Sequence, residues 1–440
     1  MDLSNLMAAR MQMAFTLGWH IVIACMGVGL PVLLLFAEGR FLKTGDPVWR
    51  AIAQRWAKGF AVLFAAGAVS GTVLSFELGL LWPEFMGTYG AVIGFPFTME
   101  GFAFFLEAIF VGIYLYGWDK LSPRVHWWTG VPIAISGFMS AWFVVTANAW
   151  MNTPRGFSVV DGVITEIDPI AAMFNPMIWS QTTHMNVAAY MVAGFSVASV
   201  YAVIRLRGND TVYVRRAMAL GLVFGCALAP LQALVGDWSA KAVAEYQPIK
   251  LAAMEGHFKT ERGAALAIGG LPDMEAGETK YAIKIPYLLS ILAYGDPNAE
   301  VKGLEAFPAE DLPPVPVVHV AFQIMVGLGT ALIALGGWLL WSWWRRRALP
   351  TSRFFLWCVA LSGPAAVLAM EAGWVVTEVG RQPWIVFGHM RTADAVTDAP
   401  GIWWVFAGTM AIYGILTVGI VTVLRVLARR PLPKELADGS

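Results

Sequence analysis

The sequence predicts an all-α integral membrane protein with nine transmembrane helices, and three observations lead to this fold class. Of the 440 residues, 58% are hydrophobic and only 14% are charged, whereas a soluble domain carries about 25% charged residues. The mean hydropathy is +0.62. Several apolar runs are long enough, at roughly 18 residues or more, to cross the hydrocarbon core of a bilayer. The composition therefore excludes a soluble enzyme, a fibrous protein and a disordered chain.

The nine helices are expected as apolar runs of about 20 residues separated by polar loops. Their positions are 14–37, 59–81, 92–117, 127–149, 180–204, 217–236, 317–341, 354–377 and 402–424. Residues 1–237 thus hold the first six helices, and residues 317–424 hold the last three. Residues 238–316 form a long loop, in which Ile249–Phe258 and Tyr281–Tyr294 are expected to be short helices.

Lys and Arg residues alternate between the two sides of the membrane and predict its orientation. The basic segments are 40–58, 120–124, 205–216, 345–353 and the tail 425–440, whereas 82–91, 150–179 and 378–401 hold few basic residues. Basic loops stay in the cytoplasm, and long loops translocate regardless of charge. We therefore expect an external N-terminus, an external loop 238–316 and a cytoplasmic C-terminus.

Charge and cysteine content exclude further classes of function. The 30 basic and 30 acidic residues balance, so bulk charge indicates no nucleic-acid partner. The three cysteines, Cys25, Cys226 and Cys358, fall far apart in apolar runs, which is typical of small buried side chains.

Ionisable and metal-ligating side chains occur in five spans where they are energetically costly, and costly residues mark function. In the predicted orientation they all fall toward the outer side: His20, Glu100, His184, Met325 and Glu378. His, Met and carboxylate side chains at one depth suit haem irons, for which His and Met are known axial ligands.

Helical spacing places other residues on the same faces. Glu100 and Glu107 are seven residues apart, which is two turns along one stripe. Glu371, Trp374 and Glu378 also share a face, and Arg381 follows one turn later. Two buried carboxylates on one stripe suit a proton path.

Structural roles explain some of these residues equally well. A His in a span can be a hydrogen-bonded bundle residue, a Met can be core, and the glutamates can be counter-charges to Arg10 and Arg381. The remaining histidines carry no predicted role: His126 and His319 are expected at the membrane interface, and His257 and His389 in solvent. From the residues alone, the prediction is a membrane haem protein or a proton-relay protein.

Several strings closely resemble subunit I of the cytochrome bd-type quinol:oxygen oxidases. They are GWH at 18–20, MEGFAFFLEAIFVGIYLYGWDK at 99–120, TANAWMNTP at 146–154, KLAAMEG at 250–256, IPYLLSILAYG at 285–295, AFQIMVGLG at 321–329 and EAGWVVTEVGRQPW at 371–384. The resemblance covers essentially the whole chain, in order.

The resemblance implies three haems: a low-spin haem b, a high-spin haem b, and a haem d or third haem b. His184 and Met325 match the two axial ligands of the low-spin haem, and Glu378 matches the ligand of the high-spin haem b. His20 matches an axial ligand at the dihaem centre, which we assign to haem d in preference to the high-spin haem b.

The resemblance also implies roles around the haems. Glu100 matches a carboxylate beside the dihaem centre, and Glu107 matches the next member of the proton path. Trp374 matches a tryptophan between haems. The family pattern further implies arginines near haem propionates, Arg10 and Arg381, and a quinol-site pair in the external loop, Lys250 and Glu255.

One residue departs from the family pattern, and the length of the external loop indicates one branch of the family. The family has an Arg two residues before the methionine ligand, where this chain has Gln323. The external loop is short, as in the short-loop, cyanide-insensitive-like branch. We expect Gln323 to alter charge compensation at the low-spin haem and to leave ligation intact.

The resemblance implies the haem-bearing subunit of a terminal oxidase that oxidises quinol and reduces O₂ to water, generating a proton-motive force without a pump. It also implies a bacterial cytoplasmic membrane, a second membrane subunit (subunit II) and a small single-span accessory subunit. Two alternatives stay open at this point: a proton-coupled transporter and a b-type cytochrome that only carries electrons. Transporters usually show an internal repeat, which this sequence lacks.

Overall fold

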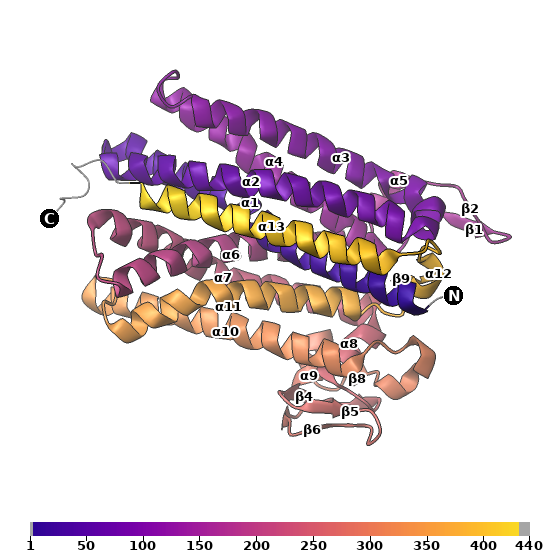
Figure 1. The fold of residues 1–440 in the computed structure, drawn as a ribbon. Coiled ribbons are helices and arrows are strands. Elements are labelled where there is room, and N and C mark those ends of the chain that lie inside the picture. Colours follow the sequence, from indigo (N-terminus) through magenta and orange to yellow (C-terminus); the bar gives the residue numbers. More distant parts are fainter. Residues whose placement is uncertain (1–2, 431–440) are drawn as a thin grey trace.

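The computed structural model describes residues 3–430, and within them nine helices are long and apolar enough to cross a membrane. They lie side by side in one bundle (Figure 1). They are α1 (Leu3–Thr44), α2 (Pro47–Leu81), α3 (Pro83–Tyr116), α4 (Pro123–Asn152), α6 (Ile178–Leu206), α7 (Val212–Tyr246), α10 (Val315–Arg346), α11 (Arg353–Val379) and α13 (Ile402–Arg429). Each predicted span coincides with one of these helices, so the fold class is confirmed.

The helices are longer than the apolar runs that predicted them, because capping residues outside the hydrocarbon region set their ends. The Asp46 side chain accepts a hydrogen bond from the Val48 amide, and Pro47 occupies the first turn of α2. Thr211 caps α7 in the same way. Because α7 continues to Tyr246, residues 238–246 of the predicted external loop are helical.

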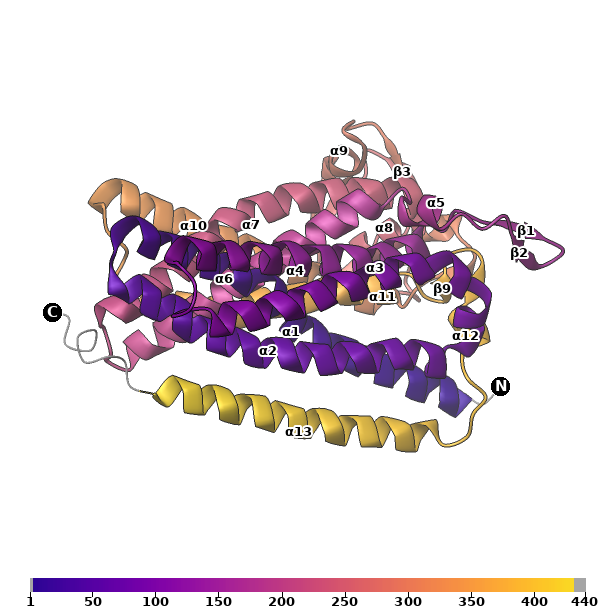
Figure 2. The same cartoon turned by 90° about the horizontal axis from the view of Figure 1, so that it is seen from above.

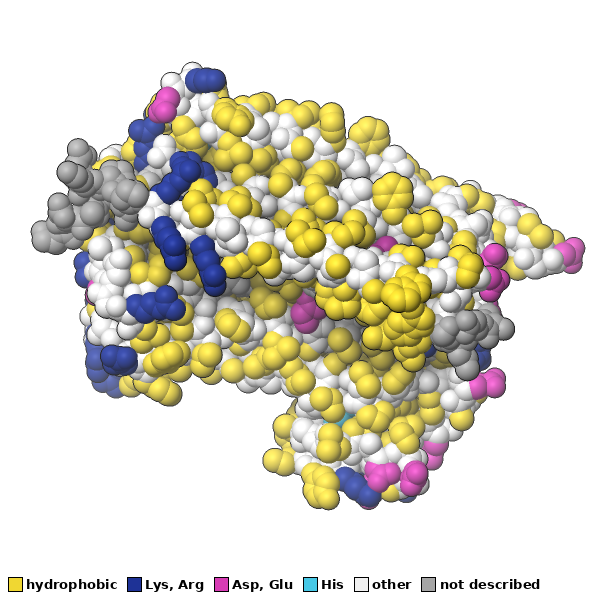
Figure 3. Space-filling model, in the orientation of Figure 1, with side chains coloured by type: hydrophobic (Ala, Val, Ile, Leu, Met, Phe, Trp, Pro, Cys, Tyr) yellow, Lys and Arg dark blue, Asp and Glu magenta, His cyan; other side chains and the backbone are white. Residues whose placement is uncertain are grey.

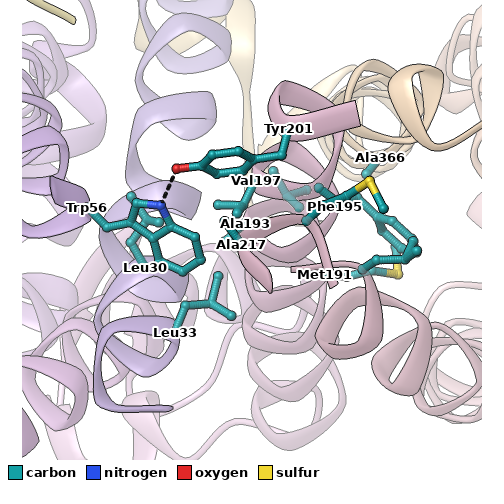
Figure 4. Close-up of a cluster of buried hydrophobic side chains, with 14 of the residues drawn as sticks. Leu30, Leu33, Trp56, Met191, Ala193, Phe195, Val197, Tyr201, Ala217 and Ala366 are labelled. Carbon is teal, nitrogen blue, oxygen red and sulfur yellow. Dashed lines mark hydrogen bonds between the residues drawn. The ribbon is translucent and has the colours of Figure 1, made fainter. Parts of the chain in front are cut away.

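The core lies between α6 and its neighbours. A Cβ on Gly194 of α6 would lie 2.8 Å from the Gly225 nitrogen of α7, so glycine allows these two backbones to approach closely. In the adjoining core, Nε1 of Trp56 donates a 2.8 Å hydrogen bond to the hydroxyl of Tyr201 among buried aliphatic side chains (Figure 4). By contrast, α13 lies along the outside of α1 and α2 and is mostly exposed (Figure 2).

The loop between α7 and α10 folds into a small lobe of nested strand pairs. Its helices are α8 (Pro248–Glu255) and α9 (Leu288–Tyr294), followed by the short 3₁₀ turns Leu304–Ala306 and Ala309–Asp311. Its strands are β3 (Glu261–Arg262), β4 (Leu266–Ile268), β5 (Leu271–Asp273), β6 (Glu278–Lys280), β7 (Ile283–Ile285) and β8 (Glu300–Val301). β3 pairs with β8, β4 with β7, and β5 with β6.

The first expected loop helix is confirmed, and the second is wrong over its first half. Residues 283–285 form strand β7, and the helix begins only at Leu288. The reason is the alternation of β-branched Ile283 and Ile285 around Lys284, which pairs with β4.

The two ends of the bundle differ. The lobe, the β1 (Ser158–Val160) and β2 (Val163–Thr165) hairpin and the N-terminal end of α1 lie at one end, called the loop end here (Figure 1). That end also carries α5 (Pro169–Met173), β9 (Trp384–Val386), β10 (Met390–Arg391) and α12 (Thr392–Ala395). Lys and Arg side chains gather at the opposite end, called the basic end (Figure 3). Of the predicted tail 425–440, residues 431–440 lie outside the described residues.

Candidate functional site

Glu378 lies in a polar cluster where α11 ends, at the loop end. Its Oε2 accepts a 2.7 Å hydrogen bond from Nη2 of Arg381, and its Oε1 accepts one from Nδ2 of Asn148 on α4. α11 ends at Val379, so Arg381 follows one turn after Glu378 and reaches back to it. Arg381 is 3% exposed, which makes this a largely buried ion pair.

Two arginines of this cluster keep buried nitrogens without a partner. Among the described residues, no acceptor contacts Nε or Nη1 of Arg381, or Nε of Arg10. Nη2 of Arg10 donates to Oε1 of Gln382 at 2.9 Å, which holds α1 against the turn after α11. A buried cationic donor without an acceptor is costly, and guanidinium groups pair well with carboxylates. These arginines therefore fit an anionic group such as a haem propionate.

Lys250 reaches into the same cluster from α8. Its Nζ donates to Oδ1 of Asn152 at 2.5 Å and to the Thr377 carbonyl at 3.3 Å. Nδ2 of Asn152 in turn donates to the Asn148 carbonyl at 2.8 Å, and Asn148 contacts Glu378. Burial, helped by the nearby charge of Arg381 and opposed by that of Glu378, lowers the pKa of Lys250 to about 7.

Glu255, at the end of the same short helix, faces elsewhere. It borders a cavity of about 230 Å³ within the lobe, whose other lining residues include His257, Glu278, Thr279 and Lys284. Its buried Oε2 has no hydrogen-bond partner among the described residues, and burial raises the pKa of Glu255 to about 8. The predicted quinol pair is thus on one helix, but the structure does not bring its two side chains together.

Two residues near the start of α10 attach the lobe to the bundle, and sequence reasoning missed both functions. Gln323 accepts from the Gly269 amide at 2.9 Å and donates to the Ala267 carbonyl at 3.0 Å. His319, one turn earlier, contacts the carbonyls of Met254 and Gly269 at 2.8 and 3.1 Å. The spacing of four residues on one helix face was a signal that could have indicated a shared contact surface.

The predicted haem ligands His184 and Met325 each pack against a glycine of a neighbouring helix. A Cβ on Gly236 of α7 would lie 3.4 Å from Cε1 of His184, and a Cβ on Gly373 of α11 would lie 3.0 Å from Sδ of Met325. Nε2 of Gln232 lies 3.2 Å from Nε2 of His184. The two donors thus lie on α6 and α10, helices that both pack against α7 and α11.

His20 of α1 has a ring orientation suited to an axial ligand. Its Nδ1 lies 2.8 Å from Oγ of Ser70, whose own hydrogen goes to the Ala66 carbonyl at 2.9 Å. Ser70 must therefore accept, and the His20 hydrogen lies on Nδ1. This leaves the lone pair of Nε2 free, which is the usual arrangement for a metal-binding histidine. The dispersal of donors over several helices also suits haems, because a porphyrin leaves only axial positions to the protein.

A carboxylate of α11 approaches α1 at Gly18. A Cβ on Gly18 would lie 3.4 Å from Oε2 of Glu371. Oε1 of Glu371 and Nε1 of Trp374, on the same face of α11, are buried without a partner among the described residues. These unpartnered atoms mark the α1–α11 contact as a place for a further polar group.

The two predicted proton-path carboxylates lie on α3. Glu107 is 4% exposed and points toward α4, where a Cβ on Gly137 would lie 3.4 Å from its Oε1. Glu100, two turns away on the same stripe, is partly exposed. Neither contacts the Glu378 cluster directly.

The expectation that His257 lies in solvent is wrong, and the expected position of His126 and His319 at the membrane interface stays a prediction. His319 is 0% exposed and His126 is 1% exposed, because each is enclosed by hydrogen-bond partners from other elements. His257 is buried against the lobe at 9% exposure, whereas His389 is exposed as expected. Sequence reasoning also missed Glu77 of α2, a buried carboxylate bound by Gln12 and Thr16, although an acid within an apolar run is itself a signal.

Comparison with known proteins gives the family. The family model described as cytochrome bd terminal oxidase subunit I matches residues 8–432. The chain belongs to the cytochrome bd terminal oxidase subunit I family. It is 38% identical to a candidate cytochrome bd menaquinol oxidase subunit I of Bacillus subtilis (strain 168), over 99% of each chain. It is 32% identical to a cytochrome bd ubiquinol oxidase subunit 1 of the same organism, over 96% of this chain and 91% of the relative.

The fold agrees with a solved member of the family. The bd oxidase structure from Geobacillus thermodenitrificans matches with a TM-score of 0.90 and 39% identity, covering 97% of this chain and 99% of the other. Family membership excludes the proton-coupled transporter. Haem and quinol are therefore the groups that the unpartnered polar atoms described above are expected to bind.

Proposed function

We propose that the Glu378–Arg381–Arg10 cluster holds haem in a subunit I that oxidises quinol at the lobe and reduces O₂ within the bundle. As a cytochrome bd subunit I, the chain is part of a terminal quinol oxidase. The observation that carries the proposal is the set of buried guanidinium nitrogens without acceptors beside Glu378. These donors need an anion, and haem propionates supply one.

The donor side chains divide among three haems. We assign His184 and Met325 to a low-spin haem b, Glu378 to a high-spin haem b, and His20 to a haem d or third haem b. When bound, the haems supply the one-electron carriers and the iron at which oxygen is reduced. Ser70 holds the His20 ring in the ligating tautomer, and we assign Trp374 to the space between the haems at the α1–α11 contact.

We assign quinol binding to the lobe and give different roles to the two residues predicted for the quinol site. Glu255 faces the cavity and accepts a proton from the quinol hydroxyl as the electrons leave, because a base must reach the hydrogen it removes. Lys250 lies on the opposite face of α8, where its hydrogen bond to Asn152 positions Asn148 and, through it, Glu378.

Protons for oxygen reduction reach the site along α3. Glu107 lies nearer the basic end, and Glu100 lies two turns closer to the loop end. The basic end faces the cytoplasm by the distribution of Lys and Arg, so the N-terminus and the lobe are external. The protons released by quinol then leave to the outer side, and the protons consumed in oxygen reduction come from the cytoplasm. This generates a proton-motive force without a pump.

The chain works with subunit II in a bacterial membrane as a multi-pass protein. We assign the cytoplasmic membrane as its location, with the lobe on the periplasmic or outer side. The family pattern also allows a small single-span accessory subunit beside subunit II.

Glu107→Gln in the two-subunit oxidase tests the assignment of Glu107 to the proton path. Gln keeps the size and hydrogen bonding of Glu but cannot ionise, so haem content and anaerobic haem reduction by quinol should stay normal. Reoxidation by O₂ and its proton uptake should slow by about a hundredfold, the low end of what a proton-transfer group contributes. Wild-type reoxidation with full haem content would make Glu107 a structural counter-charge.

A further inference from the structure

A buried Glu–His pair and a neighbouring tyrosine join three helices at the basic end of the bundle. Nδ1 of His126 on α4 lies 2.7 Å from Oε1 of Glu38 on α1, and both side chains are 2% exposed. The hydroxyl of Tyr114 on α3 donates to Oε2 of Glu38 at 2.6 Å. Nε2 of His126 lies 2.8 Å from the Tyr114 carbonyl. The three side chains form a closed cluster that the assignments above do not use.

The hydrogen bonds require this cluster to hold a proton. A carbonyl oxygen only accepts, so Nε2 of His126 carries a hydrogen and donates it to Tyr114. A neutral imidazole then presents the lone pair of Nδ1 to Oε1 of Glu38, and two lone pairs at 2.7 Å repel each other. One further proton must therefore lie between Nδ1 and Oε1, as a carboxylic acid on Glu38 or an imidazolium on His126.

A cavity connects this proton to the surface of the basic end. Its volume is about 110 Å³, and its lining residues are Glu38, Phe41, Arg50, Trp118, Pro123 and His126. A space of about 15 Å³ is enough for one water, so the cavity accommodates several. Arg50 is 39% exposed and pairs with exposed Asp119 at 2.9 Å, which places one wall of the cavity at the solvent.

On its inner side the cluster continues the stripe of α3. Tyr114 follows Glu107 by seven residues, as Glu107 follows Glu100, so the three share one face at intervals of about 10 Å. α4 presents a glycine to each of the two inner positions: a Cβ on Gly130 would lie 3.2 Å from the Tyr114 ring, and one on Gly137 would lie 3.4 Å from Glu107. The α1–α3–α4 contact thus carries polar groups along α3 and small residues opposite them.

We propose that Glu38 and His126 form the proton-uptake pair of this oxidase, loading protons from the cavity and passing them through Tyr114 toward Glu107. Before each transfer the Tyr114 hydroxyl turns its hydrogen from Oε2 of Glu38 toward water on the side of Glu107, and the Glu38 carboxyl turns so that its proton lies on the oxygen facing Tyr114. The O–H bond of Glu38 then breaks as its proton binds the Tyr114 oxygen, and the previous Tyr114 hydrogen passes to that water. A proton from water in the cavity then reloads the pair. The inference rests on the proposed function of Glu107.

Two variants test the pair by different routes. Glu38→Gln removes the ionisable group, and Tyr114→Phe removes the relay hydroxyl while the hydrogen-bonded Glu38–His126 pair remains. In the fully reduced two-subunit oxidase, proton uptake after O₂ mixing is followed with a pH-indicator dye. We expect slowing of about a hundredfold in Glu38→Gln, typical of a lost proton-transfer group, and about tenfold in Tyr114→Phe, the equivalent of one hydrogen bond.

Further readouts separate proton transfer from packing. Anaerobic haem reduction by quinol and haem content should match the wild type in both variants, and turnover of Glu38→Gln should slow more in D₂O than wild-type turnover does. Asp210→Asn is the charge control, because it removes an exposed carboxylate at the same end, paired with Arg205 at 2.6 Å. It should leave proton uptake unchanged.

The outcomes decide the two proposals separately. Wild-type proton uptake in Glu38→Gln and Tyr114→Phe, with Glu107→Gln still slow, overturns the uptake pair and leaves the Glu107 relay standing. Normal uptake in all three variants overturns both. Equal slowing in Asp210→Asn also overturns the pair, because the effect would then come from surface charge.

Discussion

The side-chain nitrogen of Lys250 lies 2.5 Å from Oδ1 of Asn152, inside the helix bundle and away from the cavity beside Glu255. Lys250 and Glu255 are five residues apart on α8, and five residues of a helix turn the side-chain direction by about 140°. One short helix thus presents an acid to the lobe and an amine to the Glu378 cluster.

Lys250→Met should therefore affect the Glu378 cluster more than quinol binding. The variant keeps the length of the side chain and loses the hydrogen bond to Asn152, so kcat should fall by about tenfold, the low end for a hydrogen bond to a charged group. The high-spin haem spectrum should change, while KM for quinol stays near the wild-type value. Lys241→Met, which removes an exposed cation of α7 paired with Asp237, is the matched control. A raised KM with an unchanged spectrum would place Lys250 against quinol instead.

The pH dependence of quinol oxidation should follow Glu255. Because burial raises the pKa of Glu255 to about 8, its protonated form dominates below that pH and the base form above it. Hence kcat/KM for quinol should rise with pH until about pH 8. Glu255→Gln should abolish the rise and lower kcat/KM by about a hundredfold. Glu278→Gln, at an exposed acid lining the same cavity, should keep the wild-type profile; a rise that persists in Glu255→Gln would assign the titration to another group.

Met325→Leu should convert the low-spin haem to high spin or loosen it, since a thioether is a weak ligand and the His184 imidazole remains. His184→Ala should lose that haem altogether. Absorption spectra of the reduced and oxidised enzyme give the measurement. Met218→Leu makes the same change at a fully buried position of α7 and should leave the spectrum intact. Normal low-spin bands in both Met325→Leu and His184→Ala would show that the ligands lie elsewhere.

Gln323→Leu should loosen the lobe. It removes two hydrogen bonds to strand β4 and the glycine after it, and leaves a half-buried amide and carbonyl unpaired, at a cost of about 1 kcal/mol each, the low end for an unpaired group. We expect faster proteolysis within residues 260–285 and a higher KM for quinol. Thr330→Val, at an exposed position on the same helix whose hydroxyl donates to the Val326 carbonyl at 2.8 Å, should change neither. Unchanged proteolysis in Gln323→Leu would mean that His319 and the strand pairs hold the lobe without it.

The sequence predicted each membrane helix because hydropathy is a local property: a run of about 20 apolar residues has one favourable environment whatever its neighbours are. The helical period likewise predicted that Glu100 and Glu107 share a stripe, and that Arg381 follows Glu378 by one turn. The secondary structure of the lobe was harder to predict, since Tyr281–Tyr294 contains both strand and helix signals. Pairing with β4 makes the first half of this segment a strand.

The sequence by itself determined the spans, their order and the residues that share a face of one helix. Only the tertiary structure decided which faces meet: that Lys250 reaches Asn152, that Gln323 holds the lobe, and that His126 is buried against Glu38. The physical reason is that backbone geometry fixes directions within a helix, whereas contacts between helices depend on close packing. Gly194 and Gly225 illustrate this, because their lack of a side chain takes effect only where α6 and α7 approach each other.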